Sequence, residues 1–175
     1  MKNLVLVVMI ATSISLQAQI PALKLTSDGM APVVVNIEGK TASEIYQKAM
    51  NWIQVNYKHP DQVVQATVQN ENVRIRGFAS NVWTTKTLGI PGTGSLDYML
   101  ELEIKDGKYK FNISRITLCG VSPTPLLYTY KSSWKNNGDV KKSHLPAIAE
   151  IEEGLNNINL SLYNYITGKD DKNSW

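Results

Sequence analysis

Apolar and polar side chains alternate along two neighbouring stretches of the chain, and this pattern predicts a β-hairpin. Every second side chain is apolar over residues 98–105, and the alternation resumes over residues 109–113. Asp106-Gly107 lies between the two runs and is typical of a type I′ turn. Because each strand has one apolar and one polar face, we expect an antiparallel sheet that is covered on one side only.

Three further stretches are predicted to be strands. Residues 33–37 are rich in β-branched side chains, residues 62–69 are strand-like, and residues 73–79 alternate after a turn cluster at residues 70–72. In residues 73–79 the two faces are made by Val73, Ile75 and Gly77 on one side, and by Arg74, Arg76 and Phe78 on the other.

Two segments have the three- and four-residue spacing of amphipathic helices. Thr41-Ala42-Ser43-Glu44 is a capping box and predicts a helix over residues 42–57. His59-Pro60 ends this helix, because proline disfavours a helical conformation in the residue before it. A second helix is predicted over residues 145–167, with Gly168 as its C-cap. The predicted apolar faces are Ile45, Tyr46, Ala49, Trp52 and Ile53 in the first helix, and Ile148, Ile151, Leu155, Ile158, Leu162 and Ile166 in the second.

The predicted order of elements is strand, helix, four strands, helix. With one face of the sheet open, both helices must pack on the other face, which gives a two-layer α+β sandwich. A loop is predicted at residues 88–94, and an irregular or hairpin insertion at residues 121–144. We expect one domain over residues 32–168, followed by a solvated tail at residues 169–175.

The N-terminal segment has the pattern of a secretory signal peptide. Lys2 is followed by an uncharged apolar run from Leu4 to Ile14, and the segment ends in the small residue Ala18. The run is shorter than the roughly 20 residues that span a bilayer, so no membrane span is expected. Residues 1–18 are therefore predicted to be removed on export to the periplasm or the cell exterior. Residues 19–31 are a lead-in of mixed composition with no clear period.

Charge and cysteine content exclude some classes of protein. The formal charge of the 175 residues is +3, and one of these charges is Lys2. The predicted exported form is therefore only mildly basic, which argues against nucleic acid as a partner. Cys119 is the only cysteine, so no internal disulfide can form. It is either a buried small hydrophobe or a reactive thiol.

Several of these motifs resemble a bacterial family of secreted domains of unknown function with a TBP-like (TATA-binding-protein-like) fold. The resemblance spans roughly residues 30–118, and the last helix fits it in order only. It rests on Ser43-Glu44-Ile45-Tyr46, Trp52-Ile53, Ile75-Arg76-Gly77, the run from Tyr98 through Ile104, and Asp106-Gly107-Lys108-Tyr109. The family implies an exported location and a curved sheet, but no reaction and no catalytic residues. DNA binding does not follow, because fold does not set function.

The sequence contains no convincing catalytic, metal or cofactor motif. His59 and His144 have no other ligand at metal-site spacing, and Gly89–Ser95 lacks the Gly-Lys-Ser/Thr ending of a phosphate loop. Glu101 and Glu103 share one strand face and are candidates for acid–base work, or they pair with Arg74 or Lys110 across the sheet. We therefore expect no metal and no cofactor, and we favour a non-enzymatic protein.

Two groups of residues are candidates for binding. Tyr128, Tyr130 and Trp134 lie in the insertion at residues 121–144 and either contact a partner or cover the core beneath them. Arg74, Arg76 and Phe78 lie on the polar face of their strand and either bind an acidic or planar ligand or form cross-strand ion pairs.

These candidates predict a non-enzymatic binding module at the cell envelope, with a protein, a peptide or a glycan as its partner. The first alternative is an envelope hydrolase that uses a carboxylate on the sheet face. The second is a structural subunit of a surface assembly, which would form a stable oligomer.

Overall fold

The computed structural model describes residues 20–87, 90–119, 127–128 and 130–169, without the side chains of residues 85–87, 90–91, 127–128 and 130. The predicted signal peptide and the tail beyond Lys169 lie outside the described residues. The strands are β1 Leu25–Thr26, β2 Gly29–Met30, β3 Val33–Asn36, β4 Val64–Val68, β5 Asn72–Thr87, β6 Ile90–Lys105, β7 Lys108–Cys119 and β8 Leu127–Tyr128. The helices are α1 Ala42–Asn56, α2 Pro60–Val63 and α3 Leu145–Thr167, with short 3-10 turns at η1 Tyr130–Ser133 and η2 Lys142–His144.

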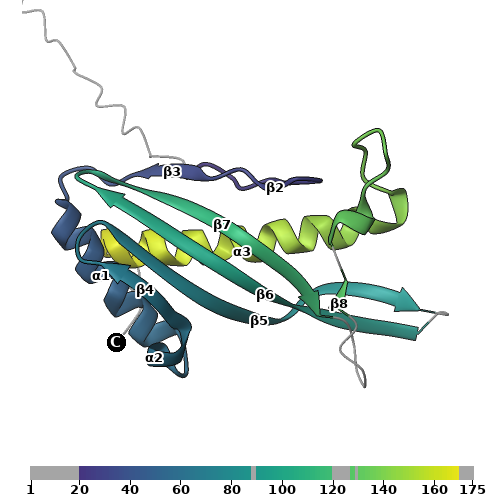
Figure 1. Cartoon of the computed structure of the whole chain (residues 1–175), viewed down its shortest axis with the longest axis horizontal. Helices are drawn as coiled ribbons and strands as arrows, with labels where there is room; N and C mark the ends of the chain where they lie inside the picture. Colours follow the sequence, from purple (N-terminus) through teal and green to yellow (C-terminus); the bar gives the residue numbers. More distant parts are fainter. Residues whose placement is uncertain (1–19, 88–89, 120–126, 129, 170–175) are drawn as a thin grey trace, which may run out of the picture.

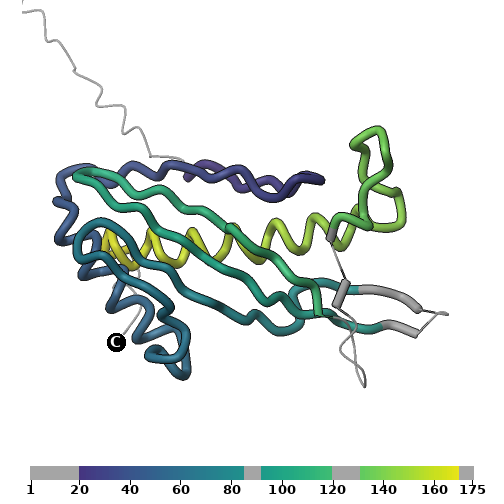
Figure 2. Tube along the Cα trace, in the orientation of Figure 1, coloured from purple at the N-terminus to yellow at the C-terminus, as the bar shows by residue number. Residues whose placement is uncertain are grey.

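One curved antiparallel sheet is backed by two helices. Its strands lie in the order β3-β7-β6-β5-β4, and β8 pairs with the end of β7. In Figure 1 the long strands β5, β6 and β7 pass in front of α3, so the helices lie behind the sheet. The tube in Figure 2 shows the same two layers, with the paired ends of β5 and β6 extending beyond the helices. The predicted α+β two-layer sandwich is confirmed.

The helices begin and end as local signals predict. Thr41 caps α1 through the Glu44 backbone N–H, and the Glu44 carboxylate accepts from the Thr41 backbone N–H at 2.8 Å, which completes the capping box. Gly168 ends α3 in the left-handed conformation with φ of 72°. The predicted apolar face of α1 is buried throughout. In α3 the predicted Ile158 is only partly buried, and Asn159 and Tyr163 are buried in addition to the other predicted residues.

The hairpin of β5 and β6 is longer than the sequence predicted. Instead of a loop over residues 88–94, β6 begins at Ile90 and pairs with β5 as far as Thr87. The strands continue because Trp83 lies opposite Gly94, where a side chain would stand within 2.0 Å of the indole ring. The glycine that signalled a loop instead gives room for a cross-strand aromatic ring.

Two local geometries also differ from the predictions. A type I′ turn at Asp106-Gly107 needs positive φ at both residues, but among the described non-glycine residues only Asn70 and Asn81 have positive φ. The Asp106 carboxylate instead accepts a hydrogen bond from the Ala42 backbone N–H at 2.7 Å, which ties the turn to the start of α1. In place of a strand beginning at residue 62, Pro60 starts the short helix α2, since proline suits the first turn of a helix.

The lead-in forms an ordered strap along α3. Leu23, Leu25 and Met30 are buried, and β1 and β2 form a small hairpin ahead of β3. The Asn156 side chain accepts from the Leu23 backbone N–H at 2.8 Å and donates to the Leu23 carbonyl at 3.1 Å. No period was visible in this segment because its strands have only two residues each, and a helix side chain satisfies the backbone of Leu23.

We expect that replacing Tyr109 with phenylalanine lowers the free energy of unfolding by about 1–3 kcal/mol. The Tyr109 hydroxyl donates to the Asn159 Oδ1 at 2.8 Å, and burial raises the pKa of this hydroxyl. Asn159 is fully buried and its Nδ2 has no partner among the described residues, so the substitution leaves the whole amide unpaired. Urea denaturation measures the loss.

The double variant Tyr109→Phe/Asn159→Leu is the control for this prediction. It removes both polar groups, so it should recover part of the stability that the single variant loses. A double variant that is less stable than Tyr109→Phe would contradict this account of the pair.

Candidate functional site

The sheet face opposite the helices carries the predicted binding residues of β5. Val73, Ile75 and Gly77 are buried against the helix side, whereas Arg74, Arg76 and Phe78 are exposed, as the alternation predicted. Phe78 is 60% exposed, which is unusual for a large aromatic side chain. We call this solvent-facing side of β3 to β7 the open face.

Charged side chains on the open face form cross-strand ion pairs. Arg74 Nε lies 2.9 Å from Glu101 Oε1, and Lys110 Nζ lies 2.8 Å from Glu103 Oε1. These are the partners that the ion-pair interpretation of the two glutamates predicted. Asn112 and Ser114 also donate to Glu101, at 3.4 and 3.2 Å. Glu101 and Glu103 are therefore held by neighbouring side chains of the sheet.

A third cluster on this face has two cations and one anion. Arg76 Nε donates to both carboxylate oxygens of Asp97, at 3.2 and 3.1 Å, and Arg115 Nη2 lies 3.2 Å from Asp97 Oδ1. Hydrogen bonding from Arg76 lowers the pKa of the Asp97 carboxyl, and the same bonds raise the pKa of the Arg76 guanidinium. The cluster therefore keeps a net positive charge. Phe78 lies directly opposite Asp97 across β5 and β6.

Asp97 and Arg115 were not among the candidates predicted from the sequence. Continued alternation along residues 109–113 would turn Arg115 inward, but the pairing of β6 with β7 shifts between Leu100–Ile113 and Met99–Arg115. This β-bulge exposes both Ser114 and Arg115 and returns Ile116 to the core. The sequence does contain a signal for this bulge, because the buried apolar positions of β7 have odd numbers up to Ile113 and even numbers after it.

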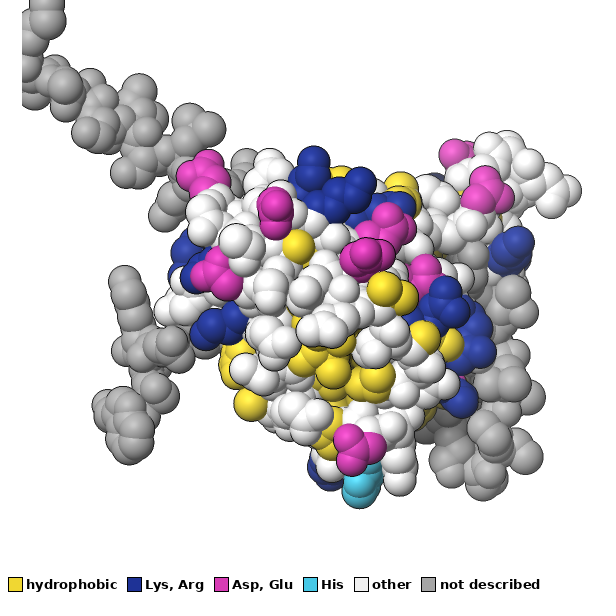
Figure 3. Space-filling view, turned by 60° about the vertical axis from the view of Figure 1, so that its left-hand side comes forward, with side chains coloured by type: hydrophobic (Ala, Val, Ile, Leu, Met, Phe, Trp, Pro, Cys, Tyr) yellow, Lys and Arg dark blue, Asp and Glu magenta, His cyan; other side chains and the backbone are white. Residues whose placement is uncertain are grey.

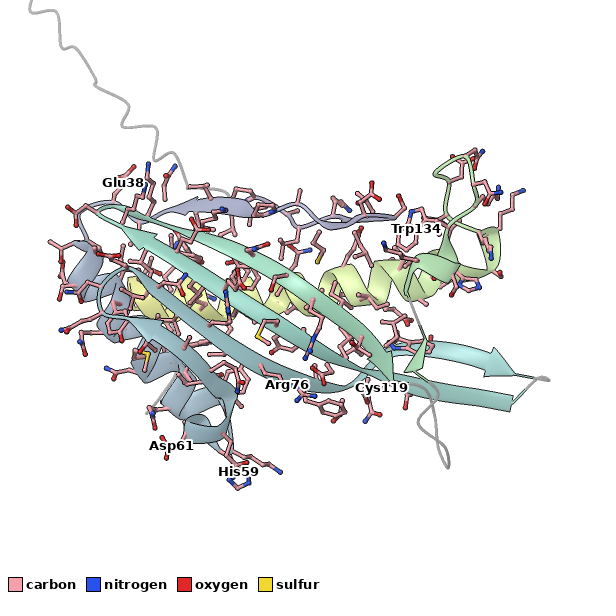
Figure 4. The ribbon with its side chains drawn as sticks, viewed as in Figure 1. Glu38, His59, Asp61, Arg76, Cys119 and Trp134 are labelled. Atoms are coloured by element: carbon pink, nitrogen blue, oxygen red, sulfur yellow. The ribbon has the colours of Figure 1, made fainter. Side chains whose placement is uncertain are left out.

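Among the candidate aromatic residues of the insertion, Trp134 lies apart from this cluster. Trp134 is buried in the core, which agrees with the alternative that this residue covers the core. Its backbone pairs with that of Val140. Figure 4 shows Trp134 near the start of α3, away from Arg76 in the middle of the sheet. Tyr128 belongs to β8 and Tyr130 begins η1, while their side chains lie outside the described part of the chain.

The remaining candidates are dispersed over the molecule. Cys119 is a half-buried free thiol at the end of β7, opposite Ser95. His144 Nδ1 lies 2.9 Å from the Ser133 hydroxyl, and His59 is exposed beside Asp61, at the outer edge of α2 in Figure 4. Within the described ranges, no three His, Cys, Asp or Glu side chains lie close enough together to hold a metal ion.

The open face also borders a crevice, and charge on the surface is mixed. The crevice, of about 320 Å³, lies between the turn of β1 and β2 and residues 112–116 of β7, and Arg115 forms part of its wall.

Figure 3 shows another side of the molecule, where basic groups lie next to acidic ones around a band of hydrophobic side chains. None of the helices in the described part of the chain has the length and apolar character needed to cross a membrane.

Comparison with known families and structures gives the same architecture. Residues 33–118 match the family model described as a domain of unknown function (DUF4468) with TBP-like fold. A DUF4468 family protein from Bacteroides ovatus ATCC 8483 aligns with a TM-score of 0.63 at 10% identity, over 86% of this chain and 91% of that protein. A TBP-like protein from Parabacteroides distasonis ATCC 8503 aligns with a TM-score of 0.58 at 15% identity, over 78% of this chain and 90% of that protein. No curated protein sequence matches the chain.

Proposed function

Through residues 33–118 the chain belongs to the DUF4468 family of domains of unknown function with a TBP-like fold, and we propose that it is a non-enzymatic binding module of the bacterial cell envelope. Its partner is a protein, a peptide or a glycan that docks on the open face. The family's fold leaves function to be argued from the site, because one fold hosts many functions.

The observation that carries this proposal is the exposed Phe78 among ion-paired side chains of the open face. Helices α1 and α3 use the other side of the sheet, where the buried side chains of β5, β6 and β7 meet them. An aromatic ring in solvent does not stabilise a sheet face that is otherwise polar. In binding interfaces, exposed aromatic side chains give a large contact area. Glu101 and Glu103 are engaged by Arg74 and Lys110, which supports binding over acid–base chemistry.

The envelope location rests on the sequence. The pattern of residues 1–18 is that of a signal peptide, and an exported protein with a single cysteine must be stabilised by its core. The extensive core, which includes Tyr109, Phe111 and Leu155, is consistent with this requirement.

A site-specific cross-link tests the proposal. A photoreactive phenylalanine analogue replaces Phe78 in the full chain expressed in its own host, and a second variant carries the analogue at Asn157, which is exposed on α3. After irradiation and cell fractionation, we expect a discrete cross-linked product in the envelope fraction from position 78 and none from position 157.

Two results would overturn the proposal. Equal product from both positions would show collision without a binding face, and the absence of product from position 78 would remove the open face as a docking site. Recovery of the protein only from the cytoplasm would contradict the envelope location.

A further inference from the structure

We propose that the open-face cluster of Arg76, Arg115 and Phe78 binds an acidic, extended peptide segment of the partner. This inference rests on the proposed function and names the chemistry of the ligand. It uses Asp97 and Arg115, which were not among the candidate residues named from the sequence.

The balance of charge within the cluster favours an acidic ligand. Asp97 is the shared partner of two guanidinium groups, whose side chains are 56% exposed for Arg76 and 49% exposed for Arg115. A guanidinium has five N–H donors, and Arg115 directs a single nitrogen at Asp97. Within the described part of the chain, the Arg115 side chain makes no other hydrogen bond, so its remaining donors can bind the carboxylate of a ligand, and carboxylates match guanidinium geometry well.

The cluster differs in its ion pairing from the other paired cations of the open face. Arg74 is matched by Glu101, and Lys110 is matched by Glu103, so each of these cations has an anion of its own. Excess positive charge therefore lies at the Asp97 cluster, and also at the β6–β7 turn, where Lys105 and Lys108 lie opposite each other. A negatively charged partner gains at the Asp97 cluster, because it competes with one carboxylate for two cations.

The apolar side chains near the two guanidinium groups favour a peptide over a free anion. Met99 lies between Arg76 and Arg115 in one row across β5, β6 and β7, and Phe78 stands in the next row opposite Asp97. Apolar surface therefore lies between and beside the guanidinium groups. A chain whose acidic side chains alternate with aromatic ones can contact both kinds of surface, whereas phosphate or acetate contacts only the cations.

Binding of a synthetic peptide tests the inference. The probe is a fluorescein-labelled decapeptide of alternating glutamate and tyrosine, and its glutamine counterpart is the control peptide. Fluorescence anisotropy should show salt-sensitive binding of the acidic peptide only. Arg115→Gln should weaken binding about two- to fivefold, and Asp97→Asn should strengthen it by a similar factor, because the variant frees both guanidinium groups.

Lys110→Gln is the matched control, since it removes one positive charge from the same face but outside the cluster. Binding to this variant should equal that of the unaltered protein. Equal weakening by Lys110→Gln and Arg115→Gln would overturn the inference, as would weaker binding to Asp97→Asn or equal binding of inorganic phosphate or anionic vesicles. If the peptide fails while the cross-link at position 78 persists, the ligand is of another chemistry and the proposed function stands.

Discussion

Replacing Trp83 with alanine is expected to lower the free energy of unfolding by about 3–5 kcal/mol, because the substitution removes a large side chain from the core. Trp83 is 8% exposed and its ring lies over Gly94 on the neighbouring strand. The next residue, Thr84, donates its hydroxyl to Glu150 Oε1 of α3 at 2.9 Å. Trp83 therefore stabilises the part of the β5–β6 hairpin that extends beyond β7.

Urea denaturation of the variant and of Val34→Ala gives the comparison. Val34 is 49% exposed on β3, so its truncation should change stability by less than about 0.5 kcal/mol. Gly94→Val probes the same contact from the opposite strand and should cost about 1–3 kcal/mol by overpacking. If Trp83→Ala lowers the free energy of unfolding as little as Val34→Ala does, the ring does not pack in the core.

Local signals predicted most of the fold because they act within a few residues. The capping box at Thr41 and Glu44 and the alternation of β5, β6 and β7 are each set by neighbouring positions. Their agreement with the structure follows from consistency between local preference and tertiary packing.

The differences arise where distant residues decide the backbone. Gly94 lies in a strand because the Trp83 ring occupies the space that a side chain at position 94 would fill. The backbone of Leu23 is held by Asn156 of α3, which lies 133 residues further along the chain. The bulge of β7 at residues 113–115 is the exception, since the change in apolar phase was visible in the sequence.

The same distinction explains how much of the candidate site was predicted. Arg76 and Phe78 were placed on the open face by the alternation of a regular strand. Arg115 needed the bulge, and the shared role of Asp97 needed the register of three strands, in which Arg76 and Arg115 both lie opposite Met99. A single sequence gives the faces of strands but not their register, so it shows candidate cations without their partners.

Replacing Leu23 with alanine is expected to cost about 2–5 kcal/mol, although Leu23 lies in a segment without a recognisable period. Its side chain is fully buried, and Asn156 satisfies both its backbone N–H and its carbonyl. Loss of the side chain leaves a cavity between the strap and α3 and weakens the docking that holds this backbone in place.

Lys24→Ala is the neighbouring control. Lys24 is 73% exposed and forms a surface ion pair with Glu152 at 2.9 Å, so its loss should change stability by less than about 1 kcal/mol. Equal effects of Leu23→Ala and Lys24→Ala in urea denaturation would show that residues 20–31 are a flexible leader. A large difference would mean that the domain begins before β3, because the strap then completes the core on the β7 side of α3.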